Sequence, residues 1–329
     1  MKQLVMTGPR KSKVVEVPIP EIGDNELLVK VKSSGMCHSE WYPWSTASPG
    51  DILGHESMGV VAKTGKNVKG FHIGDRVTGL GGGAFKEYIV MEPGKTVHVP
   101  DNVADEDAVA EPLACLLSAA MKLPPEMLGD PVAVVGCGYM GLGTISLFKA
   151  MGYGDIVAID PRPEALENAR KFGATETYTP DTIPPYYLLN WETMGKPDLT
   201  RDGTNADLFN VGFRRVMEFS GTESGLRLAG DLVCAHGTLG IGGYHNDSFR
   251  SIDYKLWNFK AITTINCHER RIEYEAGLCE RCMMLLSKGI WKFTGLADER
   301  HIYSLEEFDR GNEEMADHTD GFIKGLVRT

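Results

Sequence analysis

Glycines spaced for binding a dinucleotide stand near the middle of the sequence. The run VVGCGYMG follows an apolar stretch, and its three glycines are Gly136, Gly138 and Gly141. In a strand–turn–helix unit, the first glycine makes the tight turn, the second lets the backbone approach a pyrophosphate, and the third lets helix and strand pack closely. The expected helix has Tyr139 and Met140 in its first turn, where unpaired N–H groups and the positive end of the helix dipole favour phosphate. The pattern predicts a dinucleotide site.

An acidic residue follows at the distance that such a site requires. Asp160 stands about 20 residues after the glycines, at the end of the next apolar run, where a carboxylate accepts hydrogen bonds from a ribose 2'-OH and repels a 2'-phosphate. This favours NAD over NADP, although Arg162, two residues later, weakens the inference. The alternative is structural: the glycines form only a strand–helix turn, and Asp160 caps the next helix.

Four further residues could bind a metal ion. Cys37, His55, Glu56 and Glu111 lie at turns between short β-like runs or at the start of an expected helix. Thiolate, imidazole and carboxylate are the ligands of catalytic Zn²⁺, which keeps three protein ligands and one open position. Each residue also has an ordinary structural interpretation, as a small buried hydrophobe, a hydrogen-bonded turn residue, or a surface or helix-end charge. Their spacing alone does not establish a site.

The four possible metal ligands lie within the first 120 or so residues, which are expected to form short strands. Hydrophobic alternation and glycine or proline turns predict a small, mostly β domain. The expected strands cover residues 27–35, 58–65, 75–80 and 84–91. A strand-like run at 321–327 is expected to return to this domain, after a helix over 272–288.

From about Asp130 the pattern changes to strand followed by helix. Strands are expected at 131–136, 155–160, 214–219, 237–242 and 260–267, and helices up to Met151, over 164–174 and over 223–235. Repeated βα units predict an α/β fold with a doubly wound parallel (Rossmann) sheet, for which we expect six strands. Residues 179–210, rich in proline, aspartate and asparagine, are expected to form a long loop or surface insertion.

Length and composition limit the number of domains and the kinds of partner. A chain of 329 residues suits two domains, expected here as residues 1–122 with 268–329 for catalysis and 123–267 for the dinucleotide. The net charge of -11 disfavours nucleic acid as a partner. Neither a membrane-spanning apolar run nor a signal peptide is visible, which favours the cytoplasm. The seven cysteines suit reduced thiols better than a disulfide framework.

The order of short motifs along nearly the whole chain resembles a known family. GxCHSE at the first cysteine is followed by GHE, GDRV, a KEY segment, AEPLAC and then the nucleotide fold. This order is similar to that of the zinc-containing medium-chain alcohol and polyol dehydrogenases, especially the sorbitol dehydrogenase branch. The resemblance implies a mostly β, GroES-like catalytic domain beside the Rossmann domain, and a homo-oligomer, either a dimer or a tetramer.

The same resemblance assigns roles to residues of the first domain. Cys37 and His55 would bind one catalytic Zn²⁺, and Glu56 and Glu111 would reach the metal directly or through water, with the choice of direct ligand left open. The remaining assignments are Ser39 as the hydroxyl that passes the alcohol proton toward water, Glu40 as a group behind the metal, and His38 near the cofactor phosphates.

The chain departs from the family at one place. Many relatives have a lobe with four cysteines that binds a structural zinc between GDRV and KEY, whereas only Gly79 to Ala84 stand there in this chain, so a structural zinc is expected to be absent. The pair Cys279 and Cys282 has CxxC spacing within a helical pattern, and we interpret it as packing. The loss of the lobe also weakens the inference about assembly.

These observations predict a zinc-dependent oxidoreductase. Hydride would pass between NAD(H) and a secondary alcohol or ketone, with a polyol, sugar or cyclitol favoured as the small-molecule substrate. The aromatic residues Trp41, Tyr42 and Trp44 could line a sugar ring, although such clusters are more often core. Two alternatives stay open: a zinc-free quinone or enoyl reductase of the same superfamily, against which Cys37 and His55 argue, and an NAD-binding protein without turnover.

Overall fold

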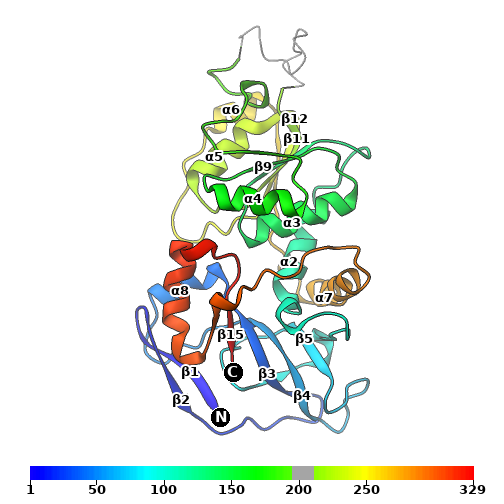
Figure 1. The fold of residues 1–329 in the computed structure, drawn as a ribbon, viewed down its shortest axis with the longest axis vertical. Coiled ribbons are helices and arrows are strands. Elements are labelled where there is room, and N and C mark those ends of the chain that lie inside the picture. The colour runs from blue at the N-terminus through cyan, green and yellow to red at the C-terminus, as the bar shows by residue number, and fades with distance from the viewer. Residues whose placement is uncertain (195–210) are drawn as a thin grey trace. The chain divides into compact units, whose positions relative to one another are not determined.

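The computed structural model describes residues 1–194 and 211–329. These residues form two compact units, of which unit 1 comprises Met1–Cys115 with Arg270–Thr329 and unit 2 comprises Leu116–Glu269 (Figure 1). Helix α2 (Ala110–Met121) runs through the first boundary between the units. Both termini belong to unit 1. Within the described ranges, no helix has the length and apolar character that crossing a membrane requires.

Unit 1 is built on β-sheet, as expected from the sequence. Its strands are β1 (Lys2–Gly8), β2 (Lys11–Glu16), β3 (Leu27–Gly35), β4 (Glu56–Thr64), β5 (Arg76–Leu80), β6 (Tyr88–Met91), β7 (Thr96–His98), β14 (Ile302–Tyr303) and β15 (Leu326–Arg328). The main sheet has the order β14-β15-β3-β4-β5-β7, with β6 also paired to β3, and β1 and β2 form a separate hairpin. In β3 the buried residues alternate with exposed Lys30 and Lys32, which is the pattern of a strand with one face in the core.

The C-terminal strand returns to this sheet. β15 pairs antiparallel with β3, with Leu326 opposite Gly35, so the expected return of the chain end is confirmed, although the strand is shorter than the predicted 321–327. The helices of the unit are α1 (Trp41–Ser45), α7 (Ile272–Ser287) and α8 (Phe308–Asp317). The strand predicted at 84–91 begins only at Tyr88, and before it Lys86 makes only a single bridge, to Gln3.

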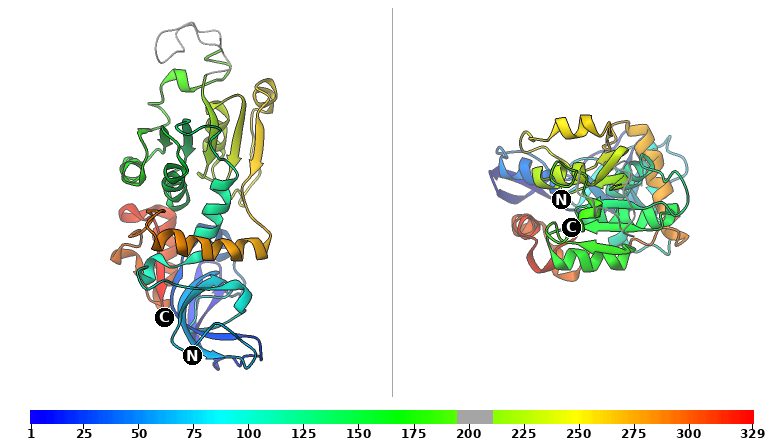
Figure 2. Two further views of the ribbon diagram at one scale, coloured as in Figure 1. Left: turned by 90° about the vertical axis from the view of Figure 1, so that its right-hand side faces the viewer. Right: turned by 90° about the horizontal axis from the view of Figure 1, so that it is seen from above.

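Unit 2 is a doubly wound parallel sheet, so the predicted Rossmann fold is confirmed. Its strands are β8 (Val132–Val135), β9 (Ile156–Ile159), β10 (Glu176–Tyr178), β11 (Phe213–Glu218), β12 (Val233–Ile241) and β13 (Thr263–Asn266). They lie in the order β10-β9-β8-β11-β12-β13, and every pairing is parallel. The helices are α3 (Tyr139–Met151), α4 (Pro163–Phe172), α5 (Glu223–Leu232) and α6 (Tyr254–Phe259). After β10 the chain returns to the middle of the sheet and adds β11, β12 and β13 on the other side of β8, so α3 and α4 cover one face and α5 and α6 the other (Figure 2).

Three local features of unit 2 differ from the expectation. The sixth strand is β10, a three-residue edge strand that the sequence pattern did not locate. The helix predicted over 223–235 ends at Leu232, and β12 begins at the next residue. The pairing of β12 with β11 shifts register near the start of β12, where His236 is left-handed (φ 59°). The strand predicted at 260–267 starts at Thr263, because Lys260 is the C-cap residue of α6 and Ala261 after it is left-handed (φ 50°).

The segment predicted as a loop is partly described. Residues 179–194 contain no strand, only one short 3-10 turn (Pro185–Tyr187), and Ile183 and Tyr187 are buried in the core of unit 2. This part is therefore a packed loop. Residues 195–210 lie outside the described ranges.

Candidate metal centre and dinucleotide site

The turn after β3 places the first candidate ligand. Cys37 precedes a short 3-10 helix (His38–Glu40), and its Sγ lies 3.1 Å from Ser39 Oγ. Glu40 is buried, and its Oε1 accepts hydrogen bonds from the Gly54 amide at 2.6 Å and from His55 Nδ1 at 3.0 Å. The carboxylate therefore fixes the orientation of the imidazole behind the cluster, as carboxylates commonly do for metal-ligating histidines.

Glu56 begins β4 and is completely buried. Its Oε2 forms an ion pair with Lys324 Nζ, which also donates to Met36 O at 3.1 Å. Gly35 makes room for this carboxylate, because a Cβ there would lie 1.8 Å from Glu56 Oε2. Within residues 1–194 and 211–329, no hydrogen-bond partner exists for Glu56 Oε1. A buried carboxylate oxygen without a donor is costly, which indicates that this atom is placed to receive a cation or a donor from outside the chain.

The structure brings three of the predicted ligands together. The ligand atoms of Cys37, His55 and Glu56 all lie within 4.8 Å of one another, close enough to hold one ion. Burial would lower the pKa of His55, but hydrogen bonds with Cys37 and Glu40 and the charges of Glu40 and Glu56 raise it far above its ordinary value. The cluster therefore favours a positive charge at its centre, and its sulfur, nitrogen and oxygen donors fit Zn²⁺.

Glu111 belongs to a second group rather than to the first. It stands in the first turn of α2, and its carboxylate lies within 4.8 Å of the ligand atoms of Cys115 and Glu275. The Cys115 thiol donates to Glu275 Oε1 at 2.9 Å and to Glu111 Oε1 at 3.5 Å. Burial and the charge of Glu56 raise the pKa of Glu111 to about 7. The sequence offered one signal for this group, because Cys115 follows Glu111 by one helical turn, but none for Glu275.

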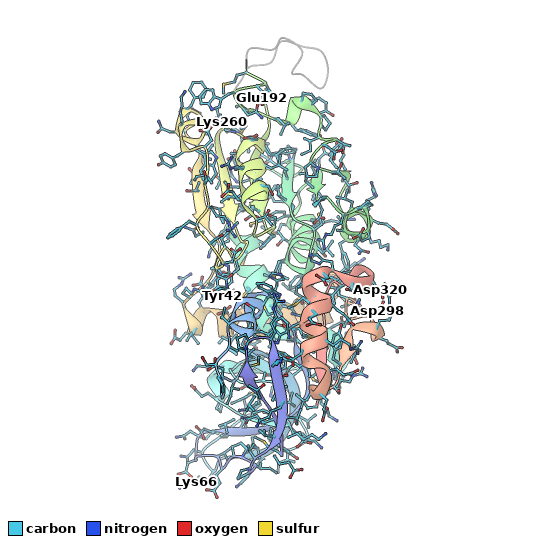
Figure 3. All side chains as sticks on the ribbon, turned by 90° about the vertical axis from the view of Figure 1, so that its left-hand side faces the viewer. Tyr42, Lys66, Glu192, Lys260, Asp298 and Asp320 are labelled. Carbon is cyan, nitrogen blue, oxygen red and sulfur yellow. The ribbon has the colours of Figure 1, made fainter. Side chains whose placement is uncertain are left out.

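Two other sequence predictions for unit 1 have clear outcomes. Trp44 is 1% exposed in the core, and its Nε1 donates to Asp309 Oδ1 at 2.8 Å, so it follows the core interpretation rather than that of a wall beside a sugar. Tyr42 is 46% exposed (Figure 3). Cys279 and Cys282 are both fully buried on α7, as packing requires. His38 is exposed, and its contact with cofactor phosphates stays a prediction.

The three glycines of the VVGCGYMG run in unit 2 have different surroundings. Gly136 has φ +92° and could not carry a Cβ, which would lie 2.6 Å from Ser220 N. A Cβ on Gly141 would lie 1.9 Å from Gly136 O, so this glycine allows α3 to begin close to the end of β8. A Cβ on Gly138 would meet no atom of the described residues within 4 Å, which leaves open space in front of the helix. Among those residues no side chain caps the N-terminus of α3, and half-buried Tyr139 and Met140 begin it, so its first N–H groups can face an anion.

Asp160 lies directly after β9 and is already hydrogen-bonded. Its Oδ2 accepts from the Cys137 amide at 2.8 Å and from Arg162 Nη2 at 3.0 Å, and its Oδ1 accepts from Arg162 Nε at 2.9 Å. Burial alone would raise the pKa of Asp160, but the hydrogen bonds from Arg162 and Cys137 and the guanidinium charge hold it below its ordinary value. The carboxylate is therefore ionised and shared with an arginine.

A second acidic network at the same edge of the sheet was not predicted. Glu218, at the end of β11, is completely buried, and its Oε2 lies 2.9 Å from His245 Nε2. Arg250 Nε donates to His245 Nδ1 at 2.9 Å. Nothing in the sequence marked these residues, because the loop that holds His245 and Arg250 has no motif.

The chain is similar in sequence to proteins of known activity. Residues 23–101 match the model of the alcohol dehydrogenase GroES-like domain. Sorbitol dehydrogenase of Bacillus subtilis (strain 168) is 30% identical over 247 residues, which cover 60% of this chain and 69% of that relative. The chain belongs to the medium-chain alcohol and polyol dehydrogenases. It is thus an oxidoreductase of the dehydrogenase type, and its predicted family is confirmed.

Further relatives of this dehydrogenase agree in sequence and fold. L-threonine 3-dehydrogenase of Escherichia coli (strain K12) is 26% identical over 346 aligned residues, which cover 94% of each chain. The crystal structure of galactitol-1-phosphate dehydrogenase from Escherichia coli superposes with a TM-score of 0.80 and 23% identity, and the match covers 100% of both chains. At this identity the superposition shows a common fold.

Proposed function

We propose that this dehydrogenase depends on one zinc ion per chain and transfers a hydride between NAD(H) and a secondary alcohol or its ketone. A polyol, sugar or cyclitol is the substrate class that the sorbitol dehydrogenase relative favours. The L-threonine 3-dehydrogenase relative is also named for a small molecule with a hydroxyl group. Small-molecule alcohols are thus the common feature. A dimeric or tetrameric assembly and a cytoplasmic location stay predictions.

One observation supports the zinc proposal most strongly. Cys37, which follows β3, converges with His55 and Glu56 at the start of β4, while the buried Glu56 Oε1 has no partner among the described residues. Lys324 holds the other oxygen, which favours Glu56 Oε1 as the carboxylate ligand. Glu111, which groups with Cys115 and Glu275, is then not the direct metal ligand. When bound, the metal supplies a Lewis acid that stabilises negative charge on the substrate oxygen.

The chain's own residues have distinct tasks in this proposal. Glu40 holds the His55 ring through Nδ1, so that the other ring nitrogen can serve as a ligand. Ser39 accepts the alcohol proton and passes it on, a task for which its hydroxyl beside Cys37 is suitably placed. In unit 2, the open space at Gly138 and the uncapped start of α3 suit a pyrophosphate.

The preference for NAD rests on Asp160. Its ionised carboxylate accepts hydrogen bonds from a ribose hydroxyl and neutralises Arg162, the cation that would otherwise attract a 2'-phosphate. We therefore propose NAD over NADP.

Two other functions fit these residues less well. A zinc-free quinone or enoyl reductase has no use for three metal-type donors within 4.8 Å of one another. An NAD-binding protein without turnover has no use for them either.

A panel of polyols, cyclitols and simple secondary alcohols, assayed for NADH formation with zinc-loaded and chelator-treated protein, tests the proposal. We expect zinc-dependent NADH formation with at least one of them. NADH formation that is unchanged after complete removal of zinc would favour the zinc-free reductase, and the binding of NAD with no turnover on any substrate would favour the binding protein.

A further inference from the structure

The loop that follows β12 has no regular secondary structure of its own. Residues 242–253, all of which are described, contain neither helix nor strand. From Tyr244 to Arg250 the loop is exposed except at His245 and Arg250, whose side chains are each only 13% exposed. The path of this loop therefore depends on a few inward-facing side chains rather than on a backbone ladder.

A chain of hydrogen bonds joins these two side chains to the buried end of β11. Glu218 is 0% exposed, and its Oε2 lies 2.9 Å from His245 Nε2. Arg250 donates to His245 Nδ1 through Nε and to Gly221 O through Nη2, both at 2.9 Å. Glu218 Oε1 accepts from Ser220 Oγ at 2.6 Å and from the Gly221 amide at 3.0 Å. One network thus holds both the loop after β12 and the turn after β11.

The partners of His245 determine which of its nitrogens carries the proton. A guanidinium group has only donors, so Nδ1 has to accept from Arg250. Nε2 is then the protonated nitrogen, and it donates to the Glu218 carboxylate. His245 must therefore donate at one end and accept at the other, which a glutamine amide could also do and a leucine could not.

The main chain at the start of the loop lies directly on Glu218. The Gly242 and Gly243 amides both donate to Glu218 O at 2.9 Å. A Cβ on Gly243 would lie 2.7 Å from Glu218 Oε2 and 2.8 Å from Gly221 N, so a glycine is needed for this close approach. His245 and Arg250 extend this attachment to the exposed part of the loop.

The network lies at the carboxyl edge of the parallel sheet, where a doubly wound fold binds its ligand. β8 and β11 are neighbours in the sheet although β9 and β10 lie between them in the chain, so the topological switch point is between β8 and β11. Asp160, after β9, is on the side of the switch point where the fingerprint places the adenosine ribose. The other half of a dinucleotide, which carries the nicotinamide, then lies toward the ends of β11 and β12.

We propose, on the basis of the proposed function, that His245 and Arg250 are positioning residues for the nicotinamide half of the cofactor. With both hydrogen bonds of His245 in place, the turn after β11 and the loop after β12 keep one shape, and the surface for this half is preorganised. Without them the loop has to be ordered when the cofactor binds, which weakens the binding of NAD. ADP lacks the nicotinamide riboside and does not need this surface.

Titration calorimetry with NAD and ADP as probes tests this inference. His245→Leu should weaken the binding of NAD by about 10-fold, the lower end of what one hydrogen bond to a charged group supports, and leave ADP almost unchanged. His245→Gln, whose amide can donate to Glu218 and accept from Arg250, should restore most of the affinity for NAD. Arg250→Met breaks the same link from its other end and should act like His245→Leu. His72→Leu, at an exposed histidine of unit 1, is the matched control and should change neither affinity.

Steady-state kinetics and Tm separate positioning from a structural role. Positioning predicts that His245→Leu raises KM for NAD by a similar factor and changes kcat little. Equal losses of NAD and ADP binding, or a lower Tm with NAD binding unchanged, would overturn the inference in favour of a structural role. A His245→Gln variant that binds NAD no better than His245→Leu would also overturn it. If the wild type binds NAD but oxidises no substrate, the two affinities still decide the inference, and the proposed function alone fails.

Discussion

The acidic side chains at the candidate sites of the two units differ in whether the protein supplies a partner for each carboxylate oxygen. In unit 2, Asp160 is paired with Arg162, and Glu218 lies in contact with His245. In unit 1, Glu56 has one oxygen paired with Lys324, while its other oxygen has no partner among the described residues. The difference indicates that the Glu56 cluster of unit 1 is placed to receive a cation from outside the chain, whereas Asp160 and Glu218 are satisfied within unit 2, where Gly138 and the start of α3 leave open space and backbone N–H groups that can face an anion.

The largest effect is expected from breaking the metal cluster of unit 1. Cys37→Ser should lower kcat/KM by roughly 10⁴-fold or more, because a catalytic metal contributes several kcal/mol to the lowering of the barrier. Steady-state kinetics of the purified variant measure this loss. Cys234→Ser, at a buried cysteine of unit 2, serves as the matched control and should keep most of the activity. A Cys37→Ser enzyme with nearly normal turnover would refute the assignment.

A smaller loss is expected from Ser39, which neighbours the cluster without belonging to it. Ser39→Ala should keep its zinc and its NAD affinity but lose about 10²- to 10⁴-fold in kcat, which is the usual contribution of positioned proton transfer. Ser39→Thr should recover much of the activity. If Ser39 is only a turn hydroxyl, its removal costs about 1 kcal/mol of stability and leaves kcat intact. Measuring kcat, zinc content and Tm on one sample separates the two roles.

The pairing of Asp160 with Arg162 offers a test in unit 2. Asp160→Ala should reduce the preference for NAD over NADP by about 10- to 100-fold, because it removes a ribose acceptor and releases a guanidinium that can bind the 2'-phosphate. Arg162→Ala should increase the preference. Specificity constants for both cofactors measure the effect, and Glu164→Ala in the first turn of α4 is a control on the neighbouring helix. A shift in the same direction for both variants would contradict this account of the pair.

The smallest effect is on stability alone. Lys260 is buried in unit 2 (Figure 3), and its Nζ donates to the carbonyls of Leu189, Gly230 and Asp231 at 2.9, 2.6 and 3.3 Å. Lys260→Met should lower the free energy of unfolding by about 1–3 kcal/mol, because it leaves buried carbonyls without a donor. Urea denaturation measures the change, and exposed Lys171→Met is the control.

The same lysine predicts a pH dependence. Burial lowers the pKa of Lys260 from 10.5 to about 8, so between these values the unfolded chain binds the proton that the folded chain has lost. The free energy of unfolding of the wild type should therefore rise relative to Lys260→Met as the pH increases from 8 to 10.5. Parallel pH profiles for the two proteins would show that Lys260 keeps its ordinary pKa.

A site could be predicted from the sequence where its residues lie close together along the chain. The glycines of unit 2, the start of α3 and Asp160 lie within one βαβ unit, so their spacing alone indicated their arrangement. The cluster of unit 1 joins β3, β4 and the C-terminal segment, and only the resemblance to a family indicated Cys37 and His55. Lys324 and Glu275 were missed because sheet pairing and helix packing, which no local pattern encodes, bring Lys324 to Glu56 and Glu275 to Glu111. Short edge strands such as β10 were missed because three residues show no periodicity.

The metal content of the purified chain tests the central claim most directly. Among the residues that the structure describes, one group combines thiolate, imidazole and carboxylate donors, so elemental analysis of protein prepared without added chelator should give one zinc per chain in the wild type. The same analysis should give close to none in Cys37→Ser. Two zinc ions per chain, no bound metal in an active wild-type enzyme, or full zinc content in an active Cys37→Ser enzyme would contradict the account.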